Sequence, residues 1–194
     1  MRRSILFSVA ALVAMAIPAA TYAGIMIDPK TKQPLVNKYR PQGVMAGSPI
    51  KKEIVPNPTK YSAGTIVVNT TERRLYLVQE DGSAIKYGIG VGREGFQWGG
   101  THSVTMKREW PDWRPPEAML KRRPDLPRFM PGGPNNPLGA RAMYIGSTIF
   151  RIHGSNEPHT IGQAVSSGCF RMSNQDVVDL YDRVKVGARV VVLR

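Results

Sequence analysis

The residues of this 194-residue chain that could do chemistry gather in one stretch near its C-terminal end. The segment IHGSNEPHTIGQAVSSGCFRM contains the only cysteine, Cys169, and two of the three histidines, His153 and His159. A cysteine attacks as its thiolate, so an imidazole that accepts the thiol proton, or pairs with the thiolate as imidazolium, would activate it. A lone cysteine can also be an inert, buried apolar side chain. The clustering favours a nucleophilic sulfur held ionised beside an imidazole.

His153 is the better candidate for the base. It ends an expected strand and precedes Gly154, so a rigid element would hold the ring while the adjoining backbone could approach other groups closely. His159 lies in an expected loop, where its position would be less fixed, and proton transfer requires hydrogen-bond distance. We also expect a backbone carbonyl from the loop after His153 to orient the ring.

The glycine before the cysteine indicates an anion-binding turn. Gly168 permits a tight turn in which the backbone N–H groups of residues 167–169 point at one spot, as in an oxyanion hole. Arg171 stands two residues after the cysteine. Its guanidinium could bind a substrate carboxylate in bidentate fashion or be an ordinary solvated surface charge. The sequence leaves these two roles open.

Two cofactor-based interpretations fit poorly. Gly90, Gly92 and Gly95 match the G-x-G-x-x-G pattern of dinucleotide-binding proteins, but the following FQWGGT contains two glycines and opens no helix that could receive a phosphate. The two clustered histidines and the cysteine could bind a metal ion, yet their spacing matches no standard zinc pattern. We therefore expect neither a metal nor an organic cofactor.

The elements that must position these residues are mostly β-strands. Apolar runs rich in β-branched residues predict strands at 65–69, 74–78, 84–92, 142–146, 148–154 and 189–193. The first three are separated by short polar turns and should form an antiparallel meander. After the cysteine, Ser173 resembles a helix N-cap, and the apolar residues of one amphipathic helix follow until Gly187 can end it. The sequence predicts a mostly-β domain with one or two short α-helices.

Two proline-rich segments differ from this pattern. Residues 24–63 contain six prolines, many lysines and no sustained apolar period, which predicts an extended N-terminal arm with little fixed structure. Residues 108–139 are rich in Pro, Trp and Gly and are too long for a simple connection in a compact domain, so we expect a lid or binding loop there. The functional domain should span residues 64–194.

The first 23 residues have the layout of a secretory signal. Arg2 and Arg3 precede an apolar run over residues 5–17, and small residues lead to Ala23, after which we expect cleavage. The run is shorter than the roughly 18 residues of a membrane-spanning helix, so no stable membrane anchor is expected. Cleavage would remove two arginines and no acids, leaving 25 basic and 14 acidic side chains and a net charge of +11. This charge attracts polyanions, but export and the lack of any zinc-finger or RNA-binding motif argue against nucleic acid.

The residues around the cysteine resemble a known family. HGSNEP followed by SSGCFRM is similar to the catalytic signature of the L,D-transpeptidases, the YkuD-like family, which pairs an early HG with a later S-[HS]-G-C-[apolar]-R. The likeness extends to GTIVVNTTERRLYLV, VGREGFQWGGTHSVT, WRPPEAM and NPLGARAMYIG, and so covers residues 64–193. The resemblance implies a β-sandwich or β-barrel with a proline-rich lid. It also implies an exported enzyme of the periplasm or cell wall that acts on peptidoglycan stem peptides.

By this resemblance, Cys169 would be the acylated nucleophile and His153 the general base and acid. Gly168 and the neighbouring amides, including that of Ser167, would form the oxyanion hole, and Arg171 would contact a substrate carboxylate or support the structure. Gly154 is a further candidate for the oxyanion or substrate-binding site. The thiolate would attack the carbonyl of the third stem residue, release D-alanine and leave a thioester. A neighbouring stem amine would then give a 3→3 cross-link, a lipoprotein lysine would become tethered, and water would make the enzyme a carboxypeptidase.

One position departs from the family's pattern. Many members carry a second histidine immediately before the Gly-Cys pair, where this chain has Ser167. A hydroxyl cannot carry the positive charge of an imidazolium, so any such role must be lost or taken over by Arg171 or by main-chain amides. A wall-binding module that keeps the fold without the chemistry is the remaining alternative, and the pairing of Cys169 with His153 argues against it.

Overall fold

The computed structural model describes residue 45 and residues 47–194. The expected signal sequence, its cleavage site and residues 24–44 of the expected arm lie outside the described residues. Among the residues described, we find no helix long and apolar enough to cross a bilayer.

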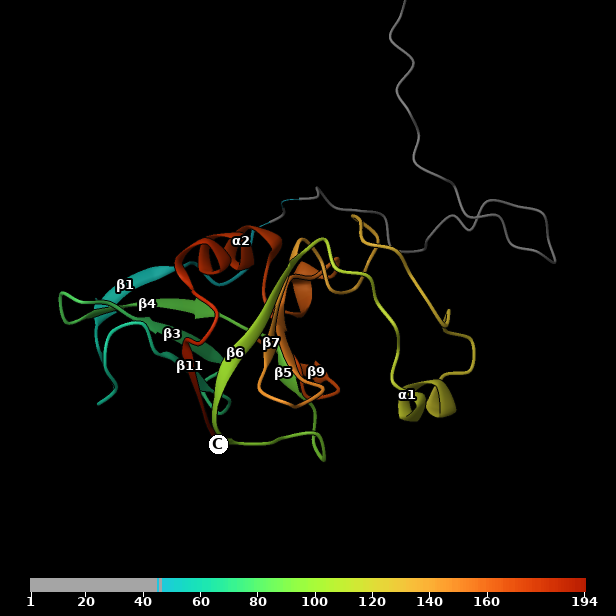
Figure 1. Ribbon diagram of the computed structural model, residues 1–194, viewed down its shortest axis with the longest axis horizontal. Helices are drawn as coiled ribbons and strands as arrows, with labels where there is room; N and C mark the ends of the chain where they lie inside the picture. Colours follow the sequence, from blue (N-terminus) through green and yellow to red (C-terminus); the bar gives the residue numbers. More distant parts are fainter. Residues whose placement is uncertain (1–44, 46) are drawn as a thin grey trace, which may run out of the picture. The chain divides into compact units, whose positions relative to one another are not determined.

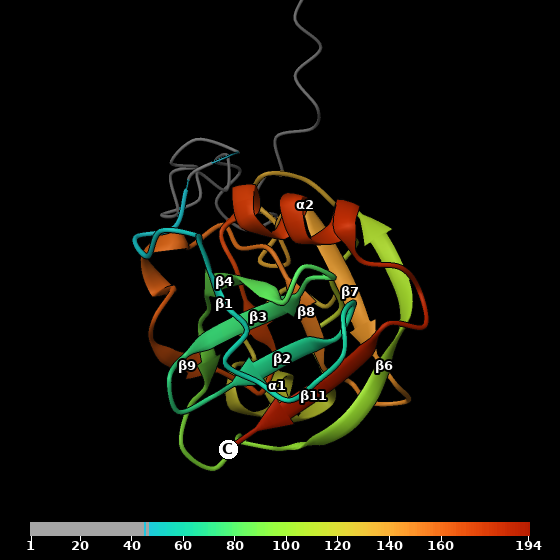
Figure 2. The same ribbon diagram turned by 90° about the vertical axis from the view of Figure 1, so that its left-hand side faces the viewer.

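A curled nine-stranded sheet dominates the domain (Figures 1 and 2). Its strand order is β1-β4-β3-β2-β11-β6-β7-β8-β10, and a second sheet pairs β5 with β9. The strands are β1 (Glu53–Pro56), β2 (Ile66–Asn69), β3 (Arg74–Val78), β4 (Ser83–Gly88), β5 (Val91–Gly92), β6 (Gly100–Glu109), β7 (Arg141–Ile145), β8 (Arg151–His153), β9 (Ala164–Ser166), β10 (Phe170–Arg171) and β11 (Arg189–Leu193). The helices of the described part are α1 (Glu117–Arg122), α2 (Asn174–Arg183) and the 3-10 helix η1 (Pro158–Thr160). The expectation of a mostly-β domain with one or two short α-helices is confirmed.

The meander and the C-terminal strand connect the two halves of the large sheet. Strands β2, β3 and β4 pair antiparallel in sequence order, as their short polar turns predict. Strand β11 then pairs parallel with β2 and antiparallel with β6. Because β6 pairs with β7, and β7 with β8, the last strand of the chain joins the meander to the strands that carry the clustered histidine and cysteine.

Apolar side chains of α2 and of the sheet share one core. The Ser173 hydroxyl caps α2 by accepting a hydrogen bond from the backbone N–H of Asp176 at 3.0 Å, which satisfies a free amide of the first turn. Helix α2 lies along one side of the strands (Figure 2). The buried residues of this core from α2, β8 and β10 are Val177, Leu180, Ile152 and Phe170. The helix predicted after the cysteine is confirmed.

The second part of the expected arm has a fixed structure, contrary to the prediction of little structure over residues 24–63. We call residues 47–58 the N-terminal strap. Within it, β1 pairs antiparallel with β4 at the edge of the sheet, and the Lys52 ammonium lies 2.9 Å from the Asp179 carboxylate of α2. The Ile50 side chain packs so closely on Gly162 that a methyl group there would lie 2.8 Å from it. The prolines of this segment made a strand hard to predict from the sequence. An edge strand can nevertheless contain proline, because one of its sides makes no ladder hydrogen bonds.

The segment expected to be a lid is anchored at its base. Trp113 and Met130 exchange two backbone hydrogen bonds of 2.8 Å. The buried Asn136 amide donates to the carbonyls of Pro111 at 3.1 Å and Pro131 at 2.9 Å. Helix α1, which the sequence did not predict, lies between these tied ends and away from α2 (Figure 1). The segment expected to be a lid is therefore an ordered loop whose two ends are tied together.

Candidate active site

The pairing of β8 with β10 brings the candidate residues onto one face of the sheet. The two strands are parallel, with Phe170 opposite Ile152 and Arg171 opposite His153. Phe170 and Ile152 are buried in the core, and side chains alternate between the two faces of a strand, so Arg171 and His153 point away from the core. Cys169, one residue before β10, falls on the same side as Arg171 by this alternation. The residue as a whole is partly exposed, while its sulfur is largely shielded from water.

The backbone holds the His153 ring in one orientation. Nδ1 lies 2.6 Å from the carbonyl oxygen of Gly154. A carbonyl can only accept, so Nδ1 donates and Nε2 is left as the acceptor of a neutral ring. Burial lowers the pKa of His153 to about 3, with the Arg171 and Arg151 charges adding to the shift against the Gly154 hydrogen bond. The ring is therefore neutral near pH 7 and can accept a proton at Nε2.

Burial of the Cys169 sulfur disfavours the ionised form that the sequence led us to expect. Burial raises the pKa of Cys169, and it outweighs the Arg151 hydrogen bonds and the charges of Arg151 and Arg171, which lower it. The same loss of hydration disfavours both the thiolate and the imidazolium. The arrangement therefore suits transfer of the proton as the sulfur attacks, not a preformed ion pair.

The turn before the cysteine uses one of the three expected amides in a hydrogen bond of its own. Gly168 has φ +107°, a conformation that favours glycine, and a side chain there would meet the Phe150 ring. The Gly168 N–H donates to the Ser166 hydroxyl at 3.2 Å, and that hydroxyl donates to the Cys169 carbonyl at 2.6 Å. Of the three amides expected to converge, those of Ser167 and Cys169 are left as candidate oxyanion donors.

Trp98 holds this turn from a distant part of the chain. Its indole Nε1 donates to the Gly168 carbonyl at 2.7 Å, and its ring stacks on Phe150 with 4.6 Å between centroids. Phe150 in turn occupies the space where a Gly168 side chain would lie. The sequence did not indicate Trp98 because no local pattern links it to Gly168, which lies 70 positions further along the chain.

Arg171 makes an internal ion pair. Its guanidinium lies 2.8 Å from the Glu157 carboxylate and 3.4 Å from the Thr160 hydroxyl. Both charged side chains are about one-fifth exposed, so this is a partly buried pair and not a solvated surface charge. Of the two roles left open by the sequence, the geometry favours a structural contact. His159, the weaker candidate base, lies on η1 with its side chain exposed.

Gly154 is required for packing beside the base. The Asn174 side-chain oxygen accepts from the backbone N–H of Ala140 at 2.9 Å and of Ser155 at 3.2 Å. A methyl group on Gly154 would lie 2.3 Å from that oxygen. Any larger residue at Gly154 would displace the carbonyl that orients the His153 ring.

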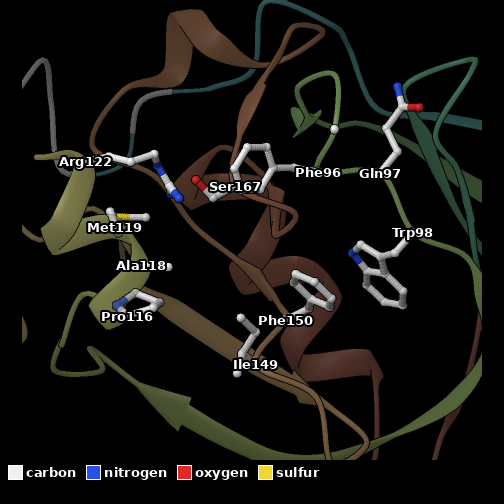
Figure 3. A pocket seen from close by; sticks show the side chains of 11 residues that line it. Phe96, Gln97, Trp98, Pro116, Ala118, Met119, Arg122, Ile149, Phe150 and Ser167 are labelled. Atoms are coloured by element: carbon white, nitrogen blue, oxygen red, sulfur yellow. The ribbon is translucent and has the colours of Figure 1, made fainter.

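A cavity of about 230 Å³ opens beside the turn that precedes the cysteine (Figure 3). Lid helix α1 forms one wall, and the 95–98 loop and the 149–150 turn form others. Its lining is mostly apolar, and Arg122 of the lid is its charged residue. The lining residues are Gly95, Phe96, Gln97, Trp98, Pro116, Ala118, Met119, Arg122, Ile149, Phe150 and Ser167. The segment expected to be a lid or binding loop thus forms a wall of this cavity.

In the structure, Gly90 lies beside β5 and Gly92 within it, and no helix begins within or directly after the glycine motif. No group of three or more His, Cys, Asp or Glu side chains in the described ranges is arranged to hold a metal ion.

Comparison with known proteins identifies the family. A family model described as the L,D-transpeptidase catalytic domain, YkuD, matches residues 63–192. The probable L,D-transpeptidase ErfK/SrfK of Escherichia coli (strain K12) is 41% identical over 137 residues, 66% of this chain and 43% of that protein. The structure of a Brucella melitensis protein described as a probable carnitine operon oxidoreductase is 44% identical, with a TM-score of 0.51 over 79% of this chain and 100% of that one. L,D-transpeptidase 3 from Mycobacterium tuberculosis shares the fold, with 17% identity and a TM-score of 0.55 over 67% of this chain and 60% of that one.

The chain belongs to the L,D-transpeptidase family. It spans about half the length of the curated relatives it matches.

Proposed function

We propose that this protein is a peptidoglycan L,D-transpeptidase in which Cys169 forms a thioester with the third residue of a tetrapeptide stem and releases D-alanine. The observation that carries the proposal is the position of Cys169 on the same sheet face as His153, whose Nε2 is available to accept a proton. The cavity under α1 offers room for a peptide beside the turn. Membership in the family supports acyl transfer as the reaction class.

In the proposed reaction, proton transfer accompanies attack. The thiol proton moves to Nε2 of His153 as the sulfur bonds to the substrate carbonyl carbon, because neither group rests ionised. The amides of Ser167 and Cys169 would stabilise the oxyanion. The imidazolium then returns its proton to the departing D-alanine amine as the thioester forms. An amine of a second stem attacks the thioester, its proton passes to the ring, and the free thiol is restored.

We propose the amine of a neighbouring stem as the acceptor, giving a 3→3 cross-link. The test is to incubate purified sacculi rich in tetrapeptide stems with the mature protein, digest them with a muramidase and identify the products by mass spectrometry. Cross-linked dimers would support the proposal. Trimmed tripeptides alone would assign an L,D-carboxypeptidase, and stems attached to an added lipoprotein would assign that acceptor. Sacculi unchanged relative to a Cys169→Ala control would contradict the acyl-transfer proposal and favour a wall-binding module.

We further propose that the protein works outside the cytoplasm, in the periplasm or at the cell wall. The support is the basic, apolar and small-residue order of residues 1–23. N-terminal sequencing of the protein recovered from cells tests it. A mature chain that begins at Gly24 is expected, and an intact, unprocessed chain in the cytoplasm would contradict it.

A further inference from the structure

The position that many family members fill with a second histidine is Ser167 here, so any positive charge beside the sulfur must come from another side chain. The Arg171 guanidinium is an incomplete source because it lies 2.8 Å from the Glu157 carboxylate. An ion pair of this kind cancels much of the charge that the guanidinium could present to a third group. The remaining candidates are the other cations on the same face of the sheet.

Arg151 lies on that face and next to the cysteine. It stands two residues before His153 on β8, and residues two apart on a strand share a face. Since Phe170 pairs with Ile152 in the parallel register, continuing the pairing by one residue sets Cys169 opposite Arg151. The Arg151 charge acts on the thiol by lowering its pKa, against the larger effect of burial.

The Arg151 side chain is fixed by packing. On its other side β8 pairs antiparallel with β7, with Arg151 directly opposite Tyr144. The guanidinium carbon lies 4.9 Å from the centre of the Tyr144 ring, a cation–π arrangement. The ring restricts the guanidinium without neutralising its charge.

Arg151 is also left without an anionic partner. In the part of the chain that the structure describes, no ion pair includes Arg151, and its buried Nε has no hydrogen-bond partner. A buried guanidinium nitrogen without an acceptor is costly, and such groups are rare in folded proteins. The anion that can form here is the sulfur of Cys169.

We propose that Arg151 stabilises the negative charge that develops on the Cys169 sulfur, in place of the histidine that other family members carry before the Gly-Cys pair. The inference rests on the proposed role of Cys169 as nucleophile. The S–H bond breaks, the proton goes to Nε2 of His153, the electron pair stays on the sulfur, and Arg151 keeps all its protons. The other ionisable groups that face the sulfur are His153, which is neutral, and Arg171, which shares its charge with Glu157.

The test is the pH dependence of alkylation of Cys169 by iodoacetamide in the intact mature protein, which needs no peptidoglycan substrate. In Arg151→Gln the alkylation rate at pH 7.5 should fall about tenfold and the apparent thiol pKa should rise by about one unit. Arg151→Lys should recover most of the rate because it restores the charge. Acyl transfer to a stem peptide should decrease in kcat with little change in KM.

Arg141→Gln is the matched control. Arg141 also has a buried Nε without a partner and lies over a tyrosine, Tyr181 at 5.3 Å, but it is one residue out of phase with the cysteine face. This variant should keep the wild-type alkylation profile. Arg151→Met, which keeps the apolar stem on Tyr144, is the second neutral variant in case the glutamine unfolds the protein.

An alkylation profile in folded Arg151→Gln or Arg151→Met that equals the wild-type profile would overturn the inference. So would loss of the folding transition in both neutral variants and in Arg151→Lys, since the role would then be structural. The proposed function fails separately, if wild-type protein with a reactive thiol transfers no stem peptide.

Discussion

At the scale of single residues, burial decides the protonation of the candidate pair. It lowers the pKa of His153 to about 3 and raises the pKa of Cys169, so both groups are neutral in the resting site. The nearby arginines favour a thiolate and oppose an imidazolium. The site therefore favours negative charge on the sulfur at the moment of attack. It disfavours a positively charged ring before the attack.

The neutral ring makes folding stability depend on pH. The His153 pKa is about 3 in the folded chain and about 6.5 in the unfolded chain, so the unfolded chain binds more protons between these values. The stabilisation is complete above pH 6.5 and is lost as the pH falls toward 3, by up to about 1.4 kcal/mol per pH unit. Urea denaturation at pH 7.5 and 5.0 should show a smaller loss in His153→Gln than in wild type. His159→Gln, altered at an exposed ring, should lose as much as wild type.

Removing the candidate nucleophile or base should have distinct effects. Cys169→Ala should form no covalent adduct with a carbapenem, as measured by intact-protein mass spectrometry, because the attacking atom is gone. His153→Ala should acylate roughly a hundredfold more slowly or worse, in line with the usual contribution of a general base. His159→Ala is the control and should acylate at the wild-type rate. The reverse order of the two histidine variants would move the base to His159.

At the scale of elements, the cysteine turn depends on contacts from outside its own strand. The turn between β9 and β10 is closed by Ser166, covered by Phe150 and held by the Trp98 indole N–H. These groups come from three segments, and two of them also line the cavity under α1. A ligand that moves Trp98 in the cavity would therefore also move the amides beside the sulfur.

Trp98→Phe tests this connection. The phenyl ring can keep the stacking on Phe150 but loses the hydrogen bond to the Gly168 carbonyl, worth about 1 kcal/mol, so kcat should fall roughly fivefold. The measurement is steady-state transfer with a stem peptide, beside a melting curve. Trp113→Phe on the lid is the control, since Trp113 is bridged to Met130 through its backbone. If kcat in Trp98→Phe is as high as in that control, the indole N–H does not position the turn.

At the scale of the whole molecule, the N-terminal strap belongs to the folded unit. Strand β1 covers the edge of β4, Lys52 pairs with Asp179, and Ile50 packs on Gly162. The segment that holds Gly162 also contains Thr160, which lies 3.4 Å from Arg171. The strap is thereby connected through packed neighbours to the sheet face that carries the cysteine.

Truncation within the strap should therefore destabilise the domain. A chain that begins at Thr59 loses β1, Lys52 and Ile50, and its exposed apolar surface should cost about 2 kcal/mol, a decrease in Tm of roughly 4–8 °C. A chain that begins at Met45 retains all the described strap contacts and is the control. Differential scanning calorimetry of the two chains decides the question. Equal Tm values would show that the strap does not contribute to the stability of the domain.

Local pattern was sufficient for several of the regular elements. The strands at 66–69, 74–78 and 189–193 and the helix capped by Ser173 follow from apolar period and capping chemistry that neighbouring residues carry. Strand β1 and helix α1 were missed because prolines and charges interrupt their local signal, while pairing with β4 and the anchored lid base supply the stability. Two-residue spacing could have indicated Arg151, since it places that side chain on the His153 face.

The sequence by itself determined which atoms are available for chemistry: one sulfur, a histidine at the end of a strand, and a glycine that permits the turn between them. The tertiary structure decided how those atoms are charged and oriented. The Gly154 carbonyl fixes the ring, Glu157 occupies Arg171, and burial keeps the thiol and imidazole neutral. Orientation and ionisation depend on hydration and on neighbours distant in the chain, and these exist only once the strands have paired.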